Sequence, residues 1–321
     1  MIARMAVALA ILCGLSTAAN ANAYPDKPVK IIVPYTAGGS VDTVGRAIAM
    51  TLEETFGQTF VVENKPGASA NIGAAYVAKS DPDGYTLFMS AATTLAAAPS
   101  IFKDLTYDPR KDLAPVALVA AQPNVLVTNP SVPVASVKEL IELARAKPGN
   151  LNYAIVSVGG PQHMAGELFM QMTETKLTQV PYKGGANAVT DLVGGQVGVM
   201  FAAIPEVVQF IEGKKLRPLA VTTKNRSSLL PEIPSLHELG LTNYELVGWI
   251  GLAAPTGTPK EIVQALNAAI GKALNDPRFK QRLHAMGLEP LGGSVEDFEA
   301  FVDTEVEKYR QLIQAAGINP M

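Results

Sequence analysis

The chain has 321 residues, of which 48% are hydrophobic and 17% are charged, and its formal net charge is −3. This composition is typical of a globular protein, and a chain of this length is expected to divide into two domains. Because no stretch of the sequence is strongly basic, we expect no nucleic-acid partner.

The first 23 residues have the pattern of a secretory signal peptide. Arg4 supplies the positive charge, residues 5–15 form an apolar run too short to span a bilayer, and Ala21-Asn22-Ala23 has the form of a cleavage site. Cys13 is the only cysteine and lies inside the apolar run, so the mature chain is expected to form no disulfide. We therefore predict that residues 1–23 are removed and that the mature protein is periplasmic.

The first part of the mature chain alternates between strand and helix patterns. An apolar stripe predicts a helix that begins at Ser40 and stops at Gly57. Strands are expected at residues 29–33, 59–63 and 85–89. This βαβαβ order predicts a parallel sheet covered by helices.

A second α/β alternation follows a change of texture at Gln122-Pro123-Asn124. Strands are expected at 153–156, 197–201 and 219–222, and helices at 163–172 and 186–193. A long apolar stretch at 244–254 precedes a helical region, for which Thr258 is the expected N-cap and Pro259 the first helical residue.

The segment between the first strand and the first helix is the strongest candidate for a binding site. Gly38 and Gly39 let the backbone turn without a Cβ, and Ser40 is the expected N-cap. The unpaired N–H groups at the start of the helix, with the positive end of its dipole behind them, would form a cup for a carboxylate. Because no Lys or Arg lies between Lys30 and Arg46, oriented dipoles rather than a buried cation would bind it.

This segment has two other interpretations. A glycine turn before a helix is also a common connector, whereas the missing GxxxxGK[ST] pattern argues against a nucleotide-binding loop. If the cup binds the ligand, we expect Gly39→Val to do more harm than Arg46→Ala, because a Cβ at Gly39 would hinder the turn.

Several motifs occur in order along the mature chain. They are YPDKPV (24–29), the glycine loop at 34–46, VVENKPGA (61–68), PDGYTL (82–87), HMAGELF (163–169), VPYKGG (180–185), GGQV (194–197) and WIGLAAP (249–255). Together they resemble the solute-binding receptors of the tripartite tricarboxylate transporter system, the Bug family, over nearly the whole mature length.

The resemblance implies the α/β fold of a type II periplasmic binding protein, with two α/β domains and a ligand cleft between them. The first domain would comprise residues 24–123 plus 249–321, and the second residues 124–248. A strand through 247–252 would be the return crossing. The implied partners are a small carboxylate and the two membrane subunits of a permease of the tripartite type, and the receptor would be a monomer without a cofactor or metal.

The loops that match the family predict a ligand site made from both domains. Its first-domain residues would be Tyr35, Thr36, Ala37, Gly38, Gly39, Ser40, Asp42, Thr93 and Thr94. Its second-domain residues would be Ser157, Gly159, Gly160, Gln162, His163, Tyr182, Lys183 and Ala202.

For several of these residues a structural role is an open alternative. Asp42 would then serve only the helix dipole, and His163 would be an ordinary buried histidine. Pro161 replaces the small polar residue that the family usually has, which removes one N–H from the second loop. Ala202 stands where many relatives have a polar group, so it would make an apolar wall, unless it only packs against the loop.

The sequence disfavours an enzyme. It contains no GxSxG, no HExxH and no Cys/His cluster with metal-binding spacing, so a periplasmic hydrolase is the less favoured alternative. A second alternative keeps the binding but changes the output, because such a receptor can present its ligand to a membrane sensor kinase. The identity of the carboxylate is not encoded in a readable pattern.

Overall fold

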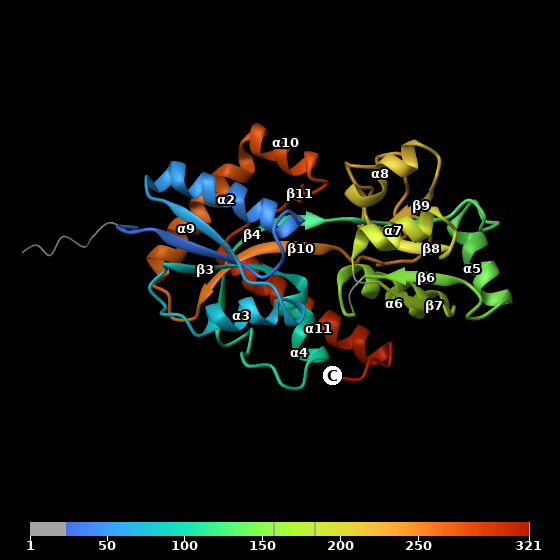
Figure 1. Ribbon diagram of the computed structural model, residues 1–321, viewed down its shortest axis with the longest axis horizontal. Coiled ribbons are helices and arrows are strands. Elements are labelled where there is room, and N and C mark those ends of the chain that lie inside the picture. Colours follow the sequence, from blue (N-terminus) through green and yellow to red (C-terminus); the bar gives the residue numbers. More distant parts are fainter. Residues whose placement is uncertain (1–23, 157, 183, 321) are drawn as a thin grey trace, which may run out of the picture.

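The computed structural model describes residues 24–156, 158–182 and 184–320. The predicted signal peptide, with Cys13, and the predicted site residues Ser157 and Lys183 lie outside the described residues. The described chain forms two α/β units that lie side by side along the longest axis of the molecule (Figure 1).

The first unit is built on a six-stranded sheet in the order β11-β4-β10-β3-β1-β2. Its strands are β1 (Val29–Val33), β2 (Phe60–Asn64), β3 (Thr86–Ala91), β4 (Leu113–Gln122), β10 (Gly248–Pro255) and β11 (Glu289–Pro290). Strand β1 pairs in parallel with both β2 and β3, as the βαβαβ pattern predicted, whereas β10 is antiparallel to β3 and β4.

Helices cover both faces of this sheet, which is why β1 reads as a continuous apolar run. Val29, Ile31 and Val33 belong to a buried cluster with α2, α9 and α10, whereas Ile32 belongs to a cluster with α3, η2 and α11. The helices are α2 (Ser40–Phe56), η1 (Ala68–Ala70), α3 (Asn71–Ala78), η2 (Thr93–Ala97), α4 (Ala98–Ile101), α9 (Lys260–Asn275), α10 (Pro277–Ala285) and α11 (Val295–Ala315).

The second unit is built on a five-stranded sheet in the order β7-β6-β8-β5-β9. Its strands are β5 (Asn124–Thr128), β6 (Asn152–Ile155), β7 (Thr178–Pro181), β8 (Val199–Ala203) and β9 (Arg217–Val221). Its helices are α5 (Val137–Ala146), α6 (Pro161–Thr173), α7 (Gly185–Val193) and α8 (Ile204–Glu212). Strand β6 runs parallel to β7 and β8, and β5 runs antiparallel to β8 and β9.

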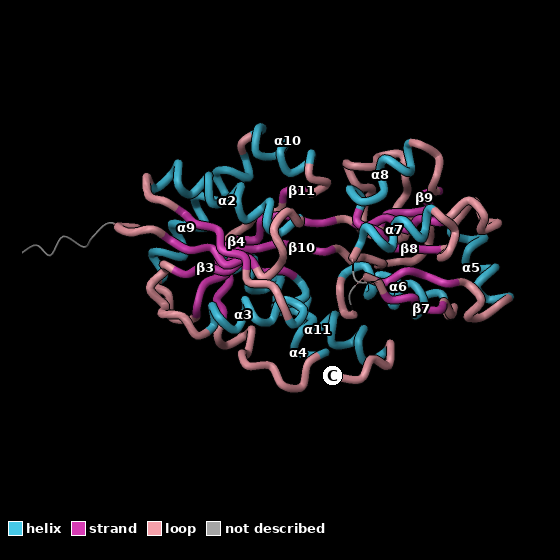
Figure 2. Tube along the Cα trace, in the orientation of Figure 1, coloured by secondary structure: helices cyan, strands magenta, loops and turns pink. Residues whose placement is uncertain are grey.

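The chain passes from the first sheet to the second at Pro123, between β4 and β5, and returns before β10 (Figure 2). Gly248 at the start of β10 pairs with Gln122 at the end of β4. The two passages therefore lie next to each other, although the residue limits proposed for the two domains stay a prediction.

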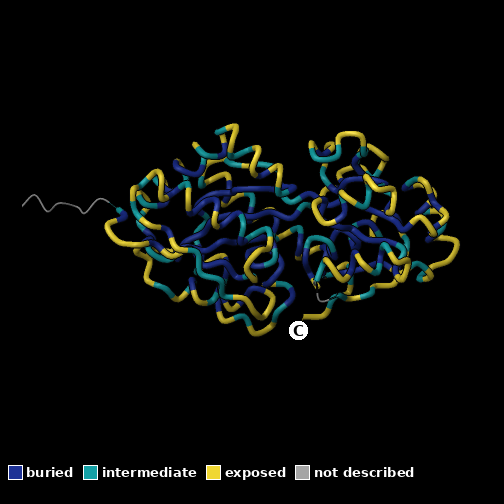
Figure 3. The backbone as a smooth tube through the Cα atoms, turned by 45° about the horizontal axis from the view of Figure 1, so that its top comes forward, coloured by how far each residue is buried: buried dark blue, intermediate teal, exposed yellow. Residues whose placement is uncertain are grey.

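Buried residues follow the strands, and exposed residues follow the outer sides of the helices (Figure 3). One buried apolar cluster runs through both units and includes Phe88 of the first sheet, Phe169 of α6 and Trp249 of β10. Within the described residues, no helix is both long enough and apolar enough to cross a membrane.

Two helix starts differ from the expectation by one residue. The N-cap of α2 is Gly39, and Ser40 is the first helical residue. The N-cap of α9 is Pro259 rather than Thr258, whose hydroxyl instead donates to the Pro255 carbonyl at 2.7 Å. The predicted end of α2 is confirmed, because Gly57 follows it in the left-handed region with φ 68°.

Candidate ligand-binding site

The loop between β1 and α2 turns at Gly38, whose φ of +88° favours glycine. Gly39 is extended, with φ −78° and ψ 169°, and a Cβ there would meet its nearest atom, the Thr36 carbonyl oxygen, at an ordinary 3.7 Å. The turn itself therefore disfavours a side chain at Gly38 rather than at Gly39, and the expectation that Gly39→Val harms binding more than Arg46→Ala stays a prediction. Residues 36–39 are all exposed.

Asp42, only 3% exposed, fixes this loop from the first turn of α2. Its Oδ2 accepts hydrogen bonds from the Gly38 N–H at 2.9 Å and from Arg46 Nε at 3.0 Å. Its Oδ1 accepts from the second guanidinium nitrogen of Arg46 at 3.0 Å and from Asn64 Nδ2 at 2.8 Å. Burial alone would raise the pKa of this carboxyl, but the hydrogen bonds from Arg46, Gly38 and Asn64 outweigh it and hold the pKa below its ordinary value.

Several backbone N–H groups at the start of α2 have no acceptor among the described residues. Thr43 is the first residue of α2 whose N–H is bonded, to the Gly39 carbonyl at 2.9 Å. Among the described residues, no acceptor receives the N–H groups of Gly39, Ser40, Val41 and Asp42. The Gly38 N–H is already bonded to Asp42, so it is not a free donor of the glycine turn. The cup therefore consists of the N–H groups that follow it, at the positive end of the α2 dipole.

The start of α2 and the start of α6 meet at the passage between the two sheets. Gln122 Nε2 donates to Ser40 Oγ at 3.2 Å, which connects α2 to the end of β4. A Cβ on Gly248 would lie 3.2 Å from Pro161 Cγ and 3.4 Å from Gln122 Cβ, so the first residue of α6 packs against the same strand pair, beside the Gln122 side chain. The fold thus brings the two predicted loops together.

Buried side chains contact the second loop, which precedes α6. Gly159, with φ +74°, donates its N–H to Nδ1 of His163 at 3.0 Å, and His163 is 1% exposed. Since Nδ1 accepts, we assign a ring proton to Nε2, which lies 3.4 Å from Glu167 Oε1 without forming a hydrogen bond. The same Glu167 oxygen accepts from the Tyr153 hydroxyl at 2.9 Å and from Gln179 at 2.6 Å. This geometry supports the structural role of His163.

The two threonines after β3 have different surroundings. Thr94 is fully buried, and its hydroxyl donates to the Ala91 carbonyl at 3.0 Å and accepts from the Ala91 N–H at 3.2 Å. This geometry supports the alternative that Thr94 has a local structural role, and its contact with a ligand stays a prediction. Thr93 Oγ1 is half-buried and lies 2.5 Å from the Tyr35 hydroxyl, so this pair stays beside the first loop. Thr93 begins the π-helix η2, a local irregularity that occurs often at functional sites.

Two further predicted residues are engaged inside the second unit. The Tyr182 hydroxyl donates to Asp191 Oδ2 at 2.8 Å, and burial together with this carboxylate raises the pKa of Tyr182 to about 12. Ala202 is fully buried in the core cluster that includes Val125 and Ala188. This packing supports the alternative that Ala202 has a structural role, and its place in a wall of the ligand site stays a prediction.

The structure therefore groups the predicted residues unevenly. The exposed or half-buried members beside the first loop are Tyr35, Thr36, Ala37, Gly38, Gly39, Ser40 and Thr93. In the second loop Gln162 is half-buried, whereas Gly159 and Gly160 are buried. That they contact a ligand stays a prediction.

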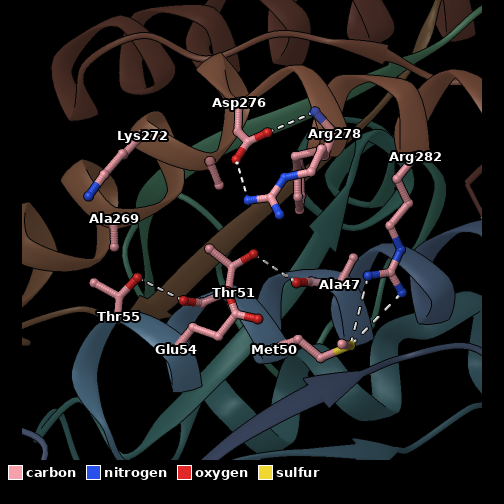
Figure 4. A pocket seen from close by; sticks show the side chains of 12 residues that line it. Ala47, Met50, Thr51, Glu54, Thr55, Ala269, Lys272, Asp276, Arg278 and Arg282 are labelled. Carbon is pink, nitrogen blue, oxygen red and sulfur yellow. Dashed lines mark hydrogen bonds and ion pairs between the residues drawn. The ribbon is translucent and has the colours of Figure 1, made fainter.

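A separate groove of about 600 Å³ lies on the outside of the first unit, between α2 and the helices α9 and α10 (Figure 4). Met50 and Arg282 face each other across it, with the guanidinium nitrogens 3.8 and 4.0 Å from the sulfur. None of the predicted site residues lines this groove.

Comparison with known proteins shows where this architecture recurs. Residues 44–318 match the model of the tripartite tricarboxylate transporter family receptor, TctC. The chain is 34% identical over 305 residues to protein BugT of Bordetella pertussis, which covers 95% of this chain and 94% of BugT.

Two solved structures of similar proteins contain small dicarboxylates. R. palustris Rpa4515 with adipate has a TM-score of 0.83 and 38% identity, covering 93% of this chain and 100% of Rpa4515. MatC (Rpa3494) from Rhodopseudomonas palustris with bound malate has a TM-score of 0.77 and 31% identity, covering 90% of this chain and 100% of MatC. The chain therefore belongs to the receptor family of the tripartite tricarboxylate transporters, the TctC or Bug proteins, and has their fold of two α/β domains.

Proposed function

We propose that this chain is an extracytoplasmic receptor that captures a small carboxylate between its two α/β units and delivers it to the membrane subunits of a tripartite transporter. The observation that carries the proposal is the set of free N–H groups at the start of α2. These groups adjoin the passage between the sheets, where Pro161 begins the helix of the opposite unit.

A carboxylate matches these donors better than a neutral or cationic group does. Backbone N–H groups at a helix start point outward, and the helix dipole adds a partial positive charge. Arg46 lies close by, but its guanidinium forms two hydrogen bonds to Asp42, so its charge is largely balanced within the receptor. The ligand's charge would therefore be stabilised by backbone dipoles, without a cation of its own.

Contacts beside the passage support closure of the two units on the ligand. Glu289 Oε1 on β11 accepts hydrogen bonds from Ser227 Oγ at 2.7 Å, from the Ser228 N–H at 2.9 Å and from Ser228 Oγ at 3.1 Å. These contacts join the first sheet to the segment that follows β9. The two bonds from Ser228 are exposed, so water can replace them when the units separate, as hinge opening requires, whereas Ser227 is buried.

Binding is tested with the protein from residue 24 onward. We expect at least one small carboxylate, with adipate, malate and 6-hydroxyhexanoate as the first probes, to raise its melting temperature, because a ligand at 100 times its dissociation constant adds about 2.7 kcal/mol to the free energy of unfolding. Hexane-1,6-diol is the matched control, since it keeps the chain length of adipate but has no carboxylate. Equal stabilisation by the diol, or no stabilisation by any carboxylate, would overturn the proposal.

Delivery, location and the absence of catalysis need separate measurements. Mass spectrometry of exported protein should show an N-terminus at Tyr24, and uptake of the ligand should require the receptor together with both membrane subunits. After long incubation the ligand should be recovered unchanged, whereas a hydrolase would release products.

A further inference from the structure

We propose that Glu206 determines which small carboxylates the receptor accepts. Its carboxylate would lie beside the far end of the ligand, which is the end opposite the carboxylate that the start of α2 binds. The inference rests on the proposed function. It predicts a preference for ligands whose far end carries a hydrogen-bond donor, an ammonium or a hydroxyl group, over ligands that end in a second carboxylate.

The position of Glu206 follows from the way β8 runs into α8. The N–H of Ile204, the first residue of α8, donates to the Pro123 carbonyl at 3.3 Å, so this helix starts at the passage between the two sheets. Glu206 lies in the first turn of α8. Because β8 and β6 run in parallel, the starts of α8 and α6 lie at the same end of the second sheet.

The Glu206 side chain reaches from α8 to the start of α7. A Cβ on Gly185 would overlap Glu206 Oε1 and would lie 2.9 Å from Oε2, so the carboxylate lies directly against the backbone of Gly185. Gly184 and Gly185 are the last residues of the VPYKGG motif and form the N-cap and first residue of α7. The Glu206 carboxylate can lie there because residue 185 is a glycine and has no Cβ.

This carboxylate has no partner within the described part of the chain. No ion pair and no hydrogen bond joins it to any described group, including the N–H groups of α7. Solvent reaches the side chain, yet the surrounding protein removes enough water to raise the pKa of Glu206 above its ordinary value. Other exposed acidic side chains here, such as Glu307 and Asp276, are instead paired with arginines.

An unpaired carboxylate has a defined effect on a ligand beside it. A ligand ammonium or hydroxyl would donate to it, and an ammonium would also gain an ion pair. A ligand carboxylate would be repelled, since like charges at close range in a partly solvated site are unfavourable. The first unit binds one ligand carboxylate through N–H groups in every case, so Glu206 acts only on the far end.

The test uses two ligand series that differ only at that end. The six-carbon probes are adipate, 6-hydroxyhexanoate and 6-aminohexanoate, and the four-carbon probes are succinate, 4-hydroxybutanoate and 4-aminobutanoate. Calorimetry compares the wild type with Glu206→Gln. Glu212→Gln is the matched control, because Glu212 is an exposed glutamate at the other end of the same helix.

Within the chain length that binds, we expect the wild type to favour the amino and hydroxy acids over the dicarboxylate. Glu206→Gln should bind the dicarboxylate about tenfold more tightly and the amino acid about tenfold more weakly, as expected when one partly solvated charge is removed. Glu212→Gln should change neither affinity. Unchanged ratios in Glu206→Gln, with binding retained, would overturn the role of Glu206 and leave the proposed function standing. If no probe binds to any of the three proteins, the proposed function fails and this inference fails with it.

Discussion

The contacts of Asp42 allow a sharp prediction for Asp42→Ala. The substitution removes an acceptor of four hydrogen bonds, from the Gly38 N–H, twice from Arg46 and from Asn64. A hydrogen bond to a charged group contributes about 1.5–3 kcal/mol, and breaking a buried pair costs about 3–5 kcal/mol. Because the Arg46 side chain is 50% exposed and can be solvated again, we expect a loss of about 2–3 kcal/mol.

The assay is urea or thermal unfolding of the wild type, Asp42→Ala and the control Glu53→Ala. Glu53 lies on the same helix and is exposed, so its removal should change the free energy of unfolding by less than about 0.5 kcal/mol. Asp42→Ala should also weaken carboxylate binding, because the Gly38 turn is no longer held. Equal stability of Asp42→Ala and Glu53→Ala would refute the role that we assign to this carboxylate.

The pH dependence of this difference follows from the lowered pKa of Asp42. The folded-state pKa lies below that of the unfolded chain, so unfolding takes up a proton between the two values. The stabilisation is fully present above the unfolded pKa of about 3.9 and is lost as the pH falls through the folded pKa. The gap between wild type and Asp42→Ala should therefore be constant near neutral pH and should narrow below about pH 4.

Three further substitutions test the loops and the closure. Gly38→Ala should lower the free energy of unfolding by about 1–2 kcal/mol because of the positive φ, whereas Gly39→Ala should lower it by less than about 1 kcal/mol. Thermal unfolding of the two variants measures both losses, and a larger loss for Gly39→Ala would contradict the prediction. Tyr182→Phe should lose about 1 kcal/mol with the bond to Asp191 but keep its ligand affinity in calorimetry; a large loss of affinity would restore Tyr182 as a ligand contact. Glu289→Ala removes the acceptor of three hydrogen bonds and should enlarge the ligand-free protein in small-angle scattering, and an unchanged radius would show that these bonds do not hold the units together.

The parts of the fold that the sequence predicted are those in which local signals agree. The stripe of α2, its start near the glycine turn and Gly57 at its end all specify one helix, and the structure places it at Ser40–Phe56. The strand β4 was missed because Leu113–Gln122 is rich in alanine and contains Pro115, so its strand preference is weak. Pairing with β10 over its full length stabilises it instead, and that partner lies more than a hundred residues away in the chain.

The candidate site shows the same division between local and distant signals. The glycine turn and the helix start could be predicted from the sequence, but the hydrogen-bond partners of each side chain could not. Ser40 is a favoured N-cap residue, yet its hydroxyl accepts a hydrogen bond from Gln122, 82 residues away, and Gly39 takes the cap position. Asn64 reaches Asp42 only because β1 pairs with β2, which places Val33 opposite Asn64.

Glu206 was missed for a related physical reason. Its sequence neighbours suggest an ordinary acidic residue in the first turn of a helix, which is favourable at any helix start. Only the packing of α8 against α7 brings its carboxylate against Gly185, where none of the described residues pairs with it.

The proposals together assign different tasks to the two units. The donors at the start of α2 are backbone groups, and they would treat one carboxylate much like another. Arg46, on the same helix, is bonded to Asp42, so it cannot match a change of ligand charge without disturbing the loop. Discrimination must then come from side chains on the opposite unit, where a single substitution can alter the far end of the site and leave the carboxylate cup intact. Glu206 is such a side chain, because its carboxylate lies against a glycine and no fold-stabilising bond of the described residues depends on it.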